Sequence, residues 1–401
     1  MGNDIPQIDA PQVDPHETAD LLAHLVSIDS QNPDLVPGAA GESEIAHAIA
    51  SIAEAGGMDV ELIEPAPGRT SVLARLQGTG GTGSGRTLLL NGHVDTVALG
   101  EMENALSPGV RDGRMYGRGA YDMKAGVTAM LMAALTLSRA SKARPEGDLL
   151  VMAVADEEYA SIGTQSVLDH MHRRGIKADG AIVTEPTELE LCVAHKGFAW
   201  AEISTRGRAA HGSRRAEGVD AIFHMGRVLR RLEQLDNDLQ GRPAHSLLGH
   251  GSLHASLISG GSGLSTYPDN CVLQIERRTL PGEDENSVAA ELEALLQAER
   301  DLDPTFAANS RVTLYRAPFE AAEGEGIVRS LQAAAASVLG TTPRSQGATY
   351  WMDAALIAAA GIPTVVFGPH GEGAHSKIEW VELASVVQCA QVLVQTAYNF
   401  C

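Results

Sequence analysis

The chain has 401 residues, 44% hydrophobic and 20% charged, which is a globular composition and more chain than one ordinary core uses. Its 51 acidic and 30 basic side chains give a formal net charge of −21, which argues against nucleic acids and anionic membranes as partners. No apolar run is long enough for a bilayer crossing and the N-terminus lacks a secretory pattern, so we expect a cytoplasmic protein.

Helices and short buried strands alternate through the first half of the chain. Apolar residues recur at helical spacing over 16–28, 43–57 and 123–140. Short, almost continuously apolar runs, typical of a buried parallel sheet, lie at 86–92, 148–158, 179–187 and, near the C-terminus, within 361–376. The fold class predicted is α/β, a mainly parallel sheet with helices on both faces. The Gly-rich segment 78–86 lacks the Lys of a phosphate loop and is predicted to be a surface turn.

Between residues 194 and 308 the pattern changes to strand, helix, two strands and helix, and residues 311–315 read as a closing strand. This order predicts a small α+β sandwich inserted into the larger domain. The domain boundaries expected are therefore 1–193 and 309–401 for the two parts of the main domain, and 194–308 for the insertion. The four cysteines are scattered, without the close spacing of a zinc knuckle or redox motif, and are expected to be reduced.

Histidine, aspartate and glutamate side chains follow the buried strands. In chain order they are His93 and Asp95, then Asp122, then Asp156, Glu157 and Glu158, then Glu185, and finally His375. Functional residues of open parallel sheets lie beyond the carboxyl ends of the strands. His, Asp and Glu are the residues that bind zinc, cobalt or manganese in hydrolases. Singly, each has a plainer interpretation; Asp122, for example, could cap the helix that follows it. Together they favour a metal site over several independent coincidences at one sheet edge.

The stretches "GHVDTV", "GRGAYDMKAG", "ADEEYASIG", "TEPT", "GRAAHGS", "ERRTLPGE" and "GAHSKIEWV" occur in this order along the chain. In them the sequence resembles the metal-dependent amidohydrolases that include acetylornithine deacetylase, succinyl-diaminopimelate desuccinylase, aminoacylase and glutamate carboxypeptidase. The resemblance implies a catalytic domain with an inserted dimerisation and lid domain, and a homodimer. It also implies two divalent ions per subunit, with zinc expected and cobalt or manganese as alternatives.

By this resemblance His93 and Glu185 hold one ion, Glu158 and His375 hold the other, and Asp122 bridges the two. Asp95 is not a ligand, and its carboxylate, two residues along the strand end, is expected to orient the His93 ring. Glu157 is implied as the group that takes a proton from water and passes it to the departing amine.

In the insertion, His211 matches a histidine that reaches the neighbouring subunit's active site and stabilises the oxyanion. Arg278 matches the arginine that grips the substrate carboxylate, with Arg277 as a competitor for this role. Tyr350 and Trp351 belong to a segment that resembles a pocket lining, although packing alone could explain them. Ser265 occupies a position where many relatives have Asn, a residue type that often contacts substrate. The identity of the substrate therefore cannot be inferred from any one relative.

The function expected is hydrolysis of the amide bond of an N-acyl amino acid, a small carboxylate substrate. A metallo-exopeptidase, acting as a carboxypeptidase or dipeptidase on the same metals, is the main alternative. A non-catalytic binding module is disfavoured, because the set of His93, Asp95, Asp122, Glu157, Glu158, Glu185 and His375 is intact. A deaminating aminohydrolase is a more remote alternative.

Overall fold

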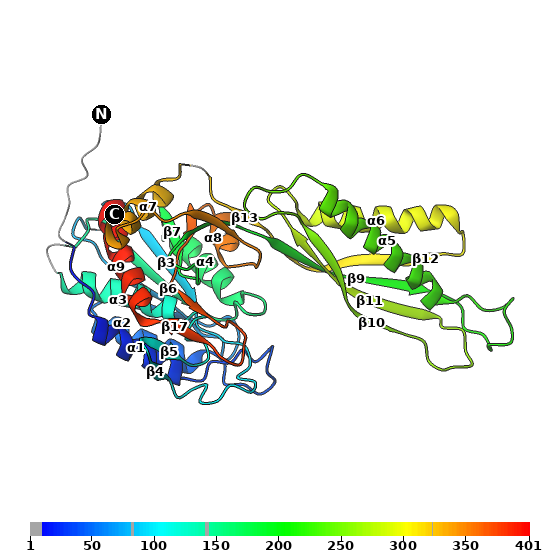
Figure 1. The fold of residues 1–401 in the computed structure, drawn as a ribbon, viewed down its shortest axis with the longest axis horizontal. Helices are drawn as coiled ribbons and strands as arrows, with labels where there is room; N and C mark the ends of the chain where they lie inside the picture. Colours follow the sequence, from blue (N-terminus) through cyan, green and yellow to red (C-terminus); the bar gives the residue numbers. More distant parts are fainter. Residues whose placement is uncertain (1–9, 82–83, 141–143, 323) are drawn as a thin grey trace. The chain divides into compact units, whose positions relative to one another are not determined.

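Figure 1 shows the computed structural model, which describes residues 10–81, 84–140, 144–322 and 324–401. The N-terminal residues 1–9 and positions 82–83 of the expected Gly-rich turn lie outside the described residues. The chain divides into two compact units. Unit 1 comprises the residues up to Val193 together with Ala321–Gln346 and Met352–Cys401, and unit 2 comprises Ala194–Glu320 and Gly347–Trp351.

Most of a nine-stranded sheet forms the centre of unit 1 (Figure 1). In spatial order its strands are β1 (Asp59–Ile63), β2 (Ser71–Leu76), β6 (Leu149–Val154), β3 (Leu88–His93), β7 (Gly180–Val183), β15 (Thr364–Val366), β8 (Leu191–His195) and β13 (Phe319–Glu320), while β14 (Ser345–Ala348) pairs with β8. The four strands β6, β3, β7 and β15 run parallel. Both flanks are antiparallel, because β2 pairs with β6 and β8 with β15 in that sense. The predicted parallel sheet is confirmed for this central part.

Helices cover both faces of this sheet, as expected for the α/β class. One face carries α1 (Pro15–Ser27), α2 (Ser43–Ala55), α3 (Lys124–Arg139), α7 (Gly326–Leu339) and α9 (Leu383–Phe400). The other carries α4 (Ile162–Arg174) and the short α8 (Ala354–Ala359). Helix α3 packs against β3 and β6 of the sheet and is also in contact with α1 and α9. Nearly all of its residues are buried. This explains why its sequence is apolar on every side.

A second, four-stranded sheet in unit 1 joins segments far apart in the sequence. Its order is β16 (Gly371–Glu372), β17 (Trp380–Glu382), β5 (Arg114–Tyr116) and β4 (Gly109–Arg111). Because β17 pairs with β5, the loop that follows β15 is held beside the segment that follows β3. Asp122 and His375, which lie in these two segments, are thereby brought to the same region.

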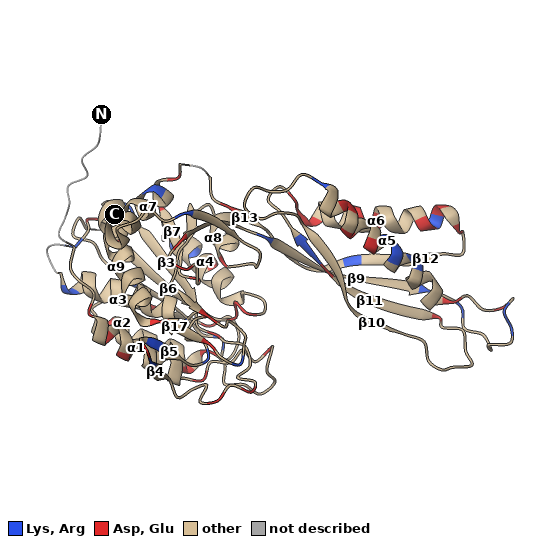
Figure 2. Ribbon diagram, viewed as in Figure 1, with Lys and Arg blue, Asp and Glu red and all other residues tan. Residues whose placement is uncertain are grey.

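Unit 2 is an antiparallel sheet with two helices on one face. The strand order is β10 (Ser252–Gly260), β11 (Asn270–Thr279), β9 (Gly197–Arg206) and β12 (Ala307–Arg316). Helices α5 (Ala221–Gly241) and α6 (Glu285–Leu302) pack on it with side chains such as Leu232, Leu292 and Ile275 buried between. Charges of both signs lie along these helices (Figure 2), and Arg231 pairs with Glu299 between them at 2.7 Å.

The C-terminal boundary of the insertion differs from the expected residue 308. Strand β12 pairs with β9 from Ala307 to Arg316, so residues 309–320 belong to unit 2. The sequence pattern indicated a strand at 311–315 that closes the insertion, yet the expected boundary at 308 stopped short of this strand. Across the described part of the chain, no helix combines the length and the apolar character that a bilayer crossing requires.

Candidate metal centre and active site

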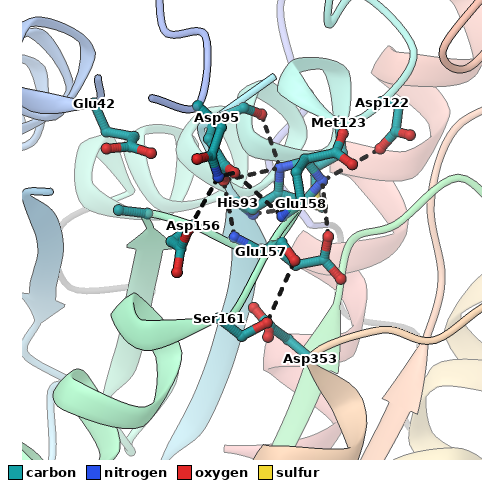
Figure 3. Close-up of polar contacts among 12 residues, drawn as sticks. Glu42, His93, Asp95, Asp122, Met123, Asp156, Glu157, Glu158, Ser161 and Asp353 are labelled. Carbon is teal, nitrogen blue, oxygen red and sulfur yellow. Dashed lines mark hydrogen bonds and ion pairs between the residues drawn. The ribbon is translucent and has the colours of Figure 1, made fainter. Parts of the chain in front are cut away.

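The predicted polar residues of unit 1 converge at the carboxyl edge of the parallel strands (Figure 3). His93 is the last residue of β3, and Glu157 and Glu158 follow β6. Glu185 follows β7, and His375 lies in the loop beyond β15. Since parallel neighbours end at the same edge, strands distant in the sequence deliver these side chains to one place.

The first group of possible ligands consists of His93, Asp122 and Glu185. His93 Nε2 lies 3.2 Å from Asp122 Oδ1 and 3.6 Å from Glu185 Oε1. The side chains of His93 and Glu185 are buried, with 1% and 6% of their surface exposed. One imidazole nitrogen and two carboxylates therefore point at a common centre that is shielded from water.

The second group consists of Asp122, Glu158 and His375. His375 Nε2 lies 3.3 Å from Asp122 Oδ2 and 3.1 Å from Glu158 Oε1. Asp122 thus offers one carboxylate oxygen to each group. It does not cap α3, as the plainer interpretation had it, because that helix begins at Lys124 after Met123 without a side-chain cap.

Burial and crowding shift the titration of these side chains. Burial raises the pKa of the Glu185 carboxyl well above its usual range, and His93 only partly opposes this effect. Hydrogen bonds to Asp122 and Glu158 raise the pKa of His375 to about 10. So many carboxylates can be buried together at low cost only if cations neutralise them. The His, Asp and Glu donors in both groups are ligands that divalent transition metals accept, so the residues fit two such ions.

Asp95 contacts the His93 ring through both its backbone carbonyl and its carboxylate. His93 Nδ1 lies 3.0 Å from the backbone carbonyl oxygen of Asp95, and 3.5 Å from its carboxylate Oδ1. The carboxylate also accepts hydrogen bonds from the backbone amides of Glu157 and Glu158, at 3.0 and 3.2 Å. The carbonyl and the carboxylate of Asp95 therefore both contact Nδ1 of the ring, and the carboxylate also holds the two glutamates.

Glu157 belongs to neither group, although its Oε2 lies 3.9 Å from His93 Nε2. Its side chain is 10% exposed. Burial raises the pKa of its carboxyl well above the usual range, with His93 opposing and Glu185 and Asp353 adding to the shift. A carboxyl that is beside the ligands but outside both groups, with a raised pKa, suits proton transfer.

A buried network beneath the glutamates was not found by the sequence reasoning. Asn32 Nδ2 donates to Asp95 Oδ2 at 2.8 Å and to Asp156 Oδ1 at 3.0 Å. Arg69 pairs with Asp156 and with Glu42, at 2.5 and 2.9 Å. These residues come from loops between helices and strands that carry no periodic signal, so only the tertiary structure reveals that they support the site.

Asp353 is a further buried carboxyl near the site. It lies beside Glu157 and Ser161 in Figure 3, and its Oδ2 accepts a hydrogen bond from Thr164 Oγ1 at 2.5 Å. Burial raises the pKa of Asp353 to about 6. In this segment the sequence analysis singled out only Tyr350 and Trp351, not Asp353. In unit 2, Tyr350 is 49% exposed, whereas Trp351 is buried and donates its indole N–H to the Ala317 carbonyl.

The two candidate arginines of unit 2 differ in their surroundings. Arg277 is buried, and its guanidinium donates to Glu283, to Glu291 and to the Arg278 carbonyl oxygen. Arg278 points to the other face of β11, where 30% of its side chain is exposed and its Nε donates to Glu276 at 2.7 Å. Arg277 is thus committed to internal ion pairs, and Arg278 is the more accessible of the two.

His211 is exposed in a loop of unit 2, and its Nδ1 lies 2.8 Å from Ser213 Oγ. It forms an isolated β-bridge with Thr266, and Gly212 donates to the carbonyl of Ser265. Ser265, where a departure from many relatives is expected, therefore lies next to His211.

An α/β sheet whose carboxyl edge gathers two histidine and carboxylate groups sharing one aspartate defines a metal-dependent hydrolase of the amidohydrolase and peptidase class. The chain belongs to the peptidase family M20/M25/M40, whose family model matches residues 89–399. The family resemblance expected from the motifs is thereby confirmed.

Two curated relatives and one solved structure illustrate the similarity. The chain is 32% identical to acetylornithine deacetylase of Myxococcus xanthus over 333 residues, which is 80% of this chain and 82% of the relative. It is 28% identical to N-formyl-4-amino-5-aminomethyl-2-methylpyrimidine deformylase of Halalkalibacterium halodurans, over 92% of each chain. A dinuclear metal-binding M20 peptidase from Bacillus subtilis superimposes with a TM-score of 0.72 at 15% identity, covering 96% of this chain and 97% of that one. This last likeness shows the fold.

Proposed function

We propose that this protein is a deacylase that hydrolyses the amide bond of N-acyl amino acids. In this proposal it uses two divalent ions, which are expected to be zinc. The observation that carries this proposal is that Asp122 offers one oxygen to each of two ligand groups. The family membership and the named activities of the deacetylase and deformylase relatives support cleavage of a small N-acyl group. We further propose that it acts in the cytoplasm, which its four free cysteines support.

In this proposal His93 and Glu185 hold one ion, Glu158 and His375 hold the other, and Asp122 bridges them. When bound, such ions polarise the amide carbonyl and lower the pKa of water toward neutrality. Glu157 accepts the proton of the attacking water and delivers it to the departing amine nitrogen. Asp95 supports this transfer because its carboxylate fixes the backbone of Glu157.

The substrate class is tested with a panel of N-acyl amino acids against dipeptides and tripeptides, with ammonia release measured in parallel. A deacylase releases carboxylic acid and free amino acid from the N-acyl compounds and leaves the peptides largely intact. Faster cleavage of the peptides would instead establish the exopeptidase, and ammonia release would establish a deaminating enzyme. Wild-type and Glu157→Gln proteins are compared throughout, so that contaminating hydrolases are recognised.

Arg278 is proposed to bind the substrate carboxylate, and its replacement by Ala is expected to raise KM. A charge-assisted contact contributes about 1.5–3 kcal/mol, which corresponds to a roughly 10- to 150-fold increase in KM. Steady-state kinetics with an N-acyl amino acid and its carboxamide measure the effect, and the carboxamide should lose much less. Arg311→Ala is the matched control, because Arg311 lies on the same sheet with 67% of its side chain exposed. Unchanged kinetics of Arg278→Ala would move the role to another cation.

We also propose a homodimer in which the insertion, residues 194–308 in the sequence-based division, forms the interface and His211 acts in the partner's active site. The edge strand β10 supports this, because its exposed Leu257 and Ile258 are apolar side chains on an otherwise unpaired sheet edge. His211 is itself exposed, so it is available to a partner.

Mixing His211→Ala with Glu157→Ala chains is expected to restore activity that neither variant has alone. Each heterodimer then contains one site with an intact Glu157 and an intact His211, so random exchange yields about a quarter of wild-type activity. Activity after unfolding-free subunit exchange, verified by native mass spectrometry of tagged chains, measures the recovery. If heterodimers form and remain inactive, His211 does not act across the subunit boundary.

A further inference from the structure

A buried ion pair joins the two segments that carry Asp122 and His375. Arg118 Nη1 donates to Glu379 Oε2 at 2.7 Å, and the two residues are 3% and 1% exposed. Arg118 belongs to the segment between β5 and α3, and Glu379 directly precedes β17. Neither residue belongs to a ligand group.

Glu379 holds the backbone at Asp122. Its Oε1 accepts hydrogen bonds from the amide of Tyr121 at 2.9 Å and from the amide of Asp122 at 3.1 Å. Two successive amides on one carboxylate oxygen fix the turn from which the Asp122 side chain projects. The peptide bond that follows, between Asp122 and Met123, is cis.

Arg118 holds the backbone at His375. While one arm of its guanidinium pairs with Glu379, Nη2 donates to the carbonyl oxygen of Ser376 at 3.0 Å. His375 itself has a φ of 60°, a left-handed conformation that a non-glycine residue keeps only when its surroundings impose it. Its side chain is 54% exposed, so packing around the imidazole alone leaves it loosely held.

We infer that Arg118 and Glu379 are positioning residues, which together set the spacing of Asp122 and His375 for the second ion. The forked guanidinium is required, because one group must reach the Glu379 carboxylate and the Ser376 carbonyl at once. This inference rests on the proposed function, since it concerns the ion that Asp122, Glu158 and His375 are proposed to hold. Partners that orient ligands in this way typically contribute 10- to 100-fold in metal affinity.

The test is a titration of the metal-free protein with Co²⁺, followed by calorimetry and by the visible absorption of the bound ion. Arg118→Lys keeps a buried cation beside Glu379 but cannot also reach Ser376, and Glu379→Gln keeps the shape but removes the charge. Both variants are expected to bind the second Co²⁺ about 10- to 100-fold more weakly, with a smaller change for the first. The two variants change the two different partners of the ion pair. If one variant folds poorly, the other still tests the inference.

Arg75→Lys is the matched control, because Arg75 pairs with the largely buried Asp148 in the same unit, at the opposite end of β6 from Glu157. It should leave both Co²⁺ affinities unchanged. Thermal unfolding of the metal-free proteins separates a general loss of stability from a loss of ion binding.

Second-site affinities that stay at the wild-type value in both variants, or that fall equally in Arg75→Lys, would overturn the inference. A fall in the unfolding temperature of the metal-free variants without a change in Co²⁺ affinity would also overturn it, because the pair would then be only structural. Wild-type protein that binds fewer than two ions would refute the proposed function itself. That outcome is recognised before any variant is made.

Discussion

Removal of divalent ions by chelation is expected to abolish hydrolysis, and added zinc, cobalt or manganese is expected to restore it. The described site offers Glu157 as a proton carrier, but a neutral water is a poor nucleophile toward an amide without an ion that lowers its pKa. Ions of this kind contribute several kcal/mol of transition-state stabilisation, so the metal-free protein should be more than about 10³-fold slower. Turnover of an N-acyl amino acid before chelation, after it and after each ion is returned measures the effect.

The same titration has a structural readout. The ions bind the folded protein, in which His93, Asp122 and Glu185 already face one another, so each ion should raise the unfolding temperature. Circular dichroism of the metal-free protein serves as the control for retained fold. Full activity of protein that metal analysis shows to hold no divalent ion would contradict the mechanism. The same analysis would reveal any divalent ion that the chelator fails to remove.

The central part of the fold is predictable because its signals are local. The runs that became β3, β6 and β7 are continuously apolar, which follows from burial on both faces of a parallel sheet. The expected boundary at 308 falls short of Glu320, where the main segment of unit 2 ends, because strand pairing is not local. Strand β12 alternates in exposure like β9 and β11, and its register with β9 extends the pairing to Arg316, beyond residue 308.

The site is predictable to the extent that strand ends meet. Each of four site residues lies at or just after the end of a recognisable strand, so their convergence follows from the sheet. His93 ends β3, Glu157 and Glu158 follow β6, and Glu185 follows β7. Asn32 and Glu379 could not be found in this way. Their side chains reach the site from loops, through contacts with Asp95 and with the amide of Asp122, and nothing in their local sequence marks these contacts.

The interpretation of Asp95 shows a different limit. A carboxylate two residues after a histidine is well placed to hold the ring, and both groups are indeed adjacent. The sequence cannot show that the backbone carbonyl takes the nearer position, at 3.0 Å, while the carboxylate lies 3.5 Å from the ring and also accepts from the amides of Glu157 and Glu158. Side-chain identity predicts which chemistry is present, whereas the competition between backbone and side-chain acceptors is decided by the chain path.

Replacement of Glu157 by Gln is expected to lower kcat by roughly 10²–10⁴ while both ions stay bound. The amide keeps the shape of the side chain but cannot accept a proton from water. Substrate affinity should survive, because Glu157 lies outside both ligand groups. The measurements are kcat and KM, together with metal content per chain.

Glu158→Gln is the matched comparison, since the two glutamates are neighbours whose backbone amides both bind the Asp95 carboxylate. A neutral amide oxygen is a weak ligand in place of a carboxylate, so the ion shared with His375 should be lost first. Two ions in Glu157→Gln and about one in Glu158→Gln would therefore distinguish proton carrier from ligand, although both variants are slow. If Glu157→Gln loses an ion and Glu158→Gln keeps two, the roles of the two residues are reversed, because only a ligand controls metal content.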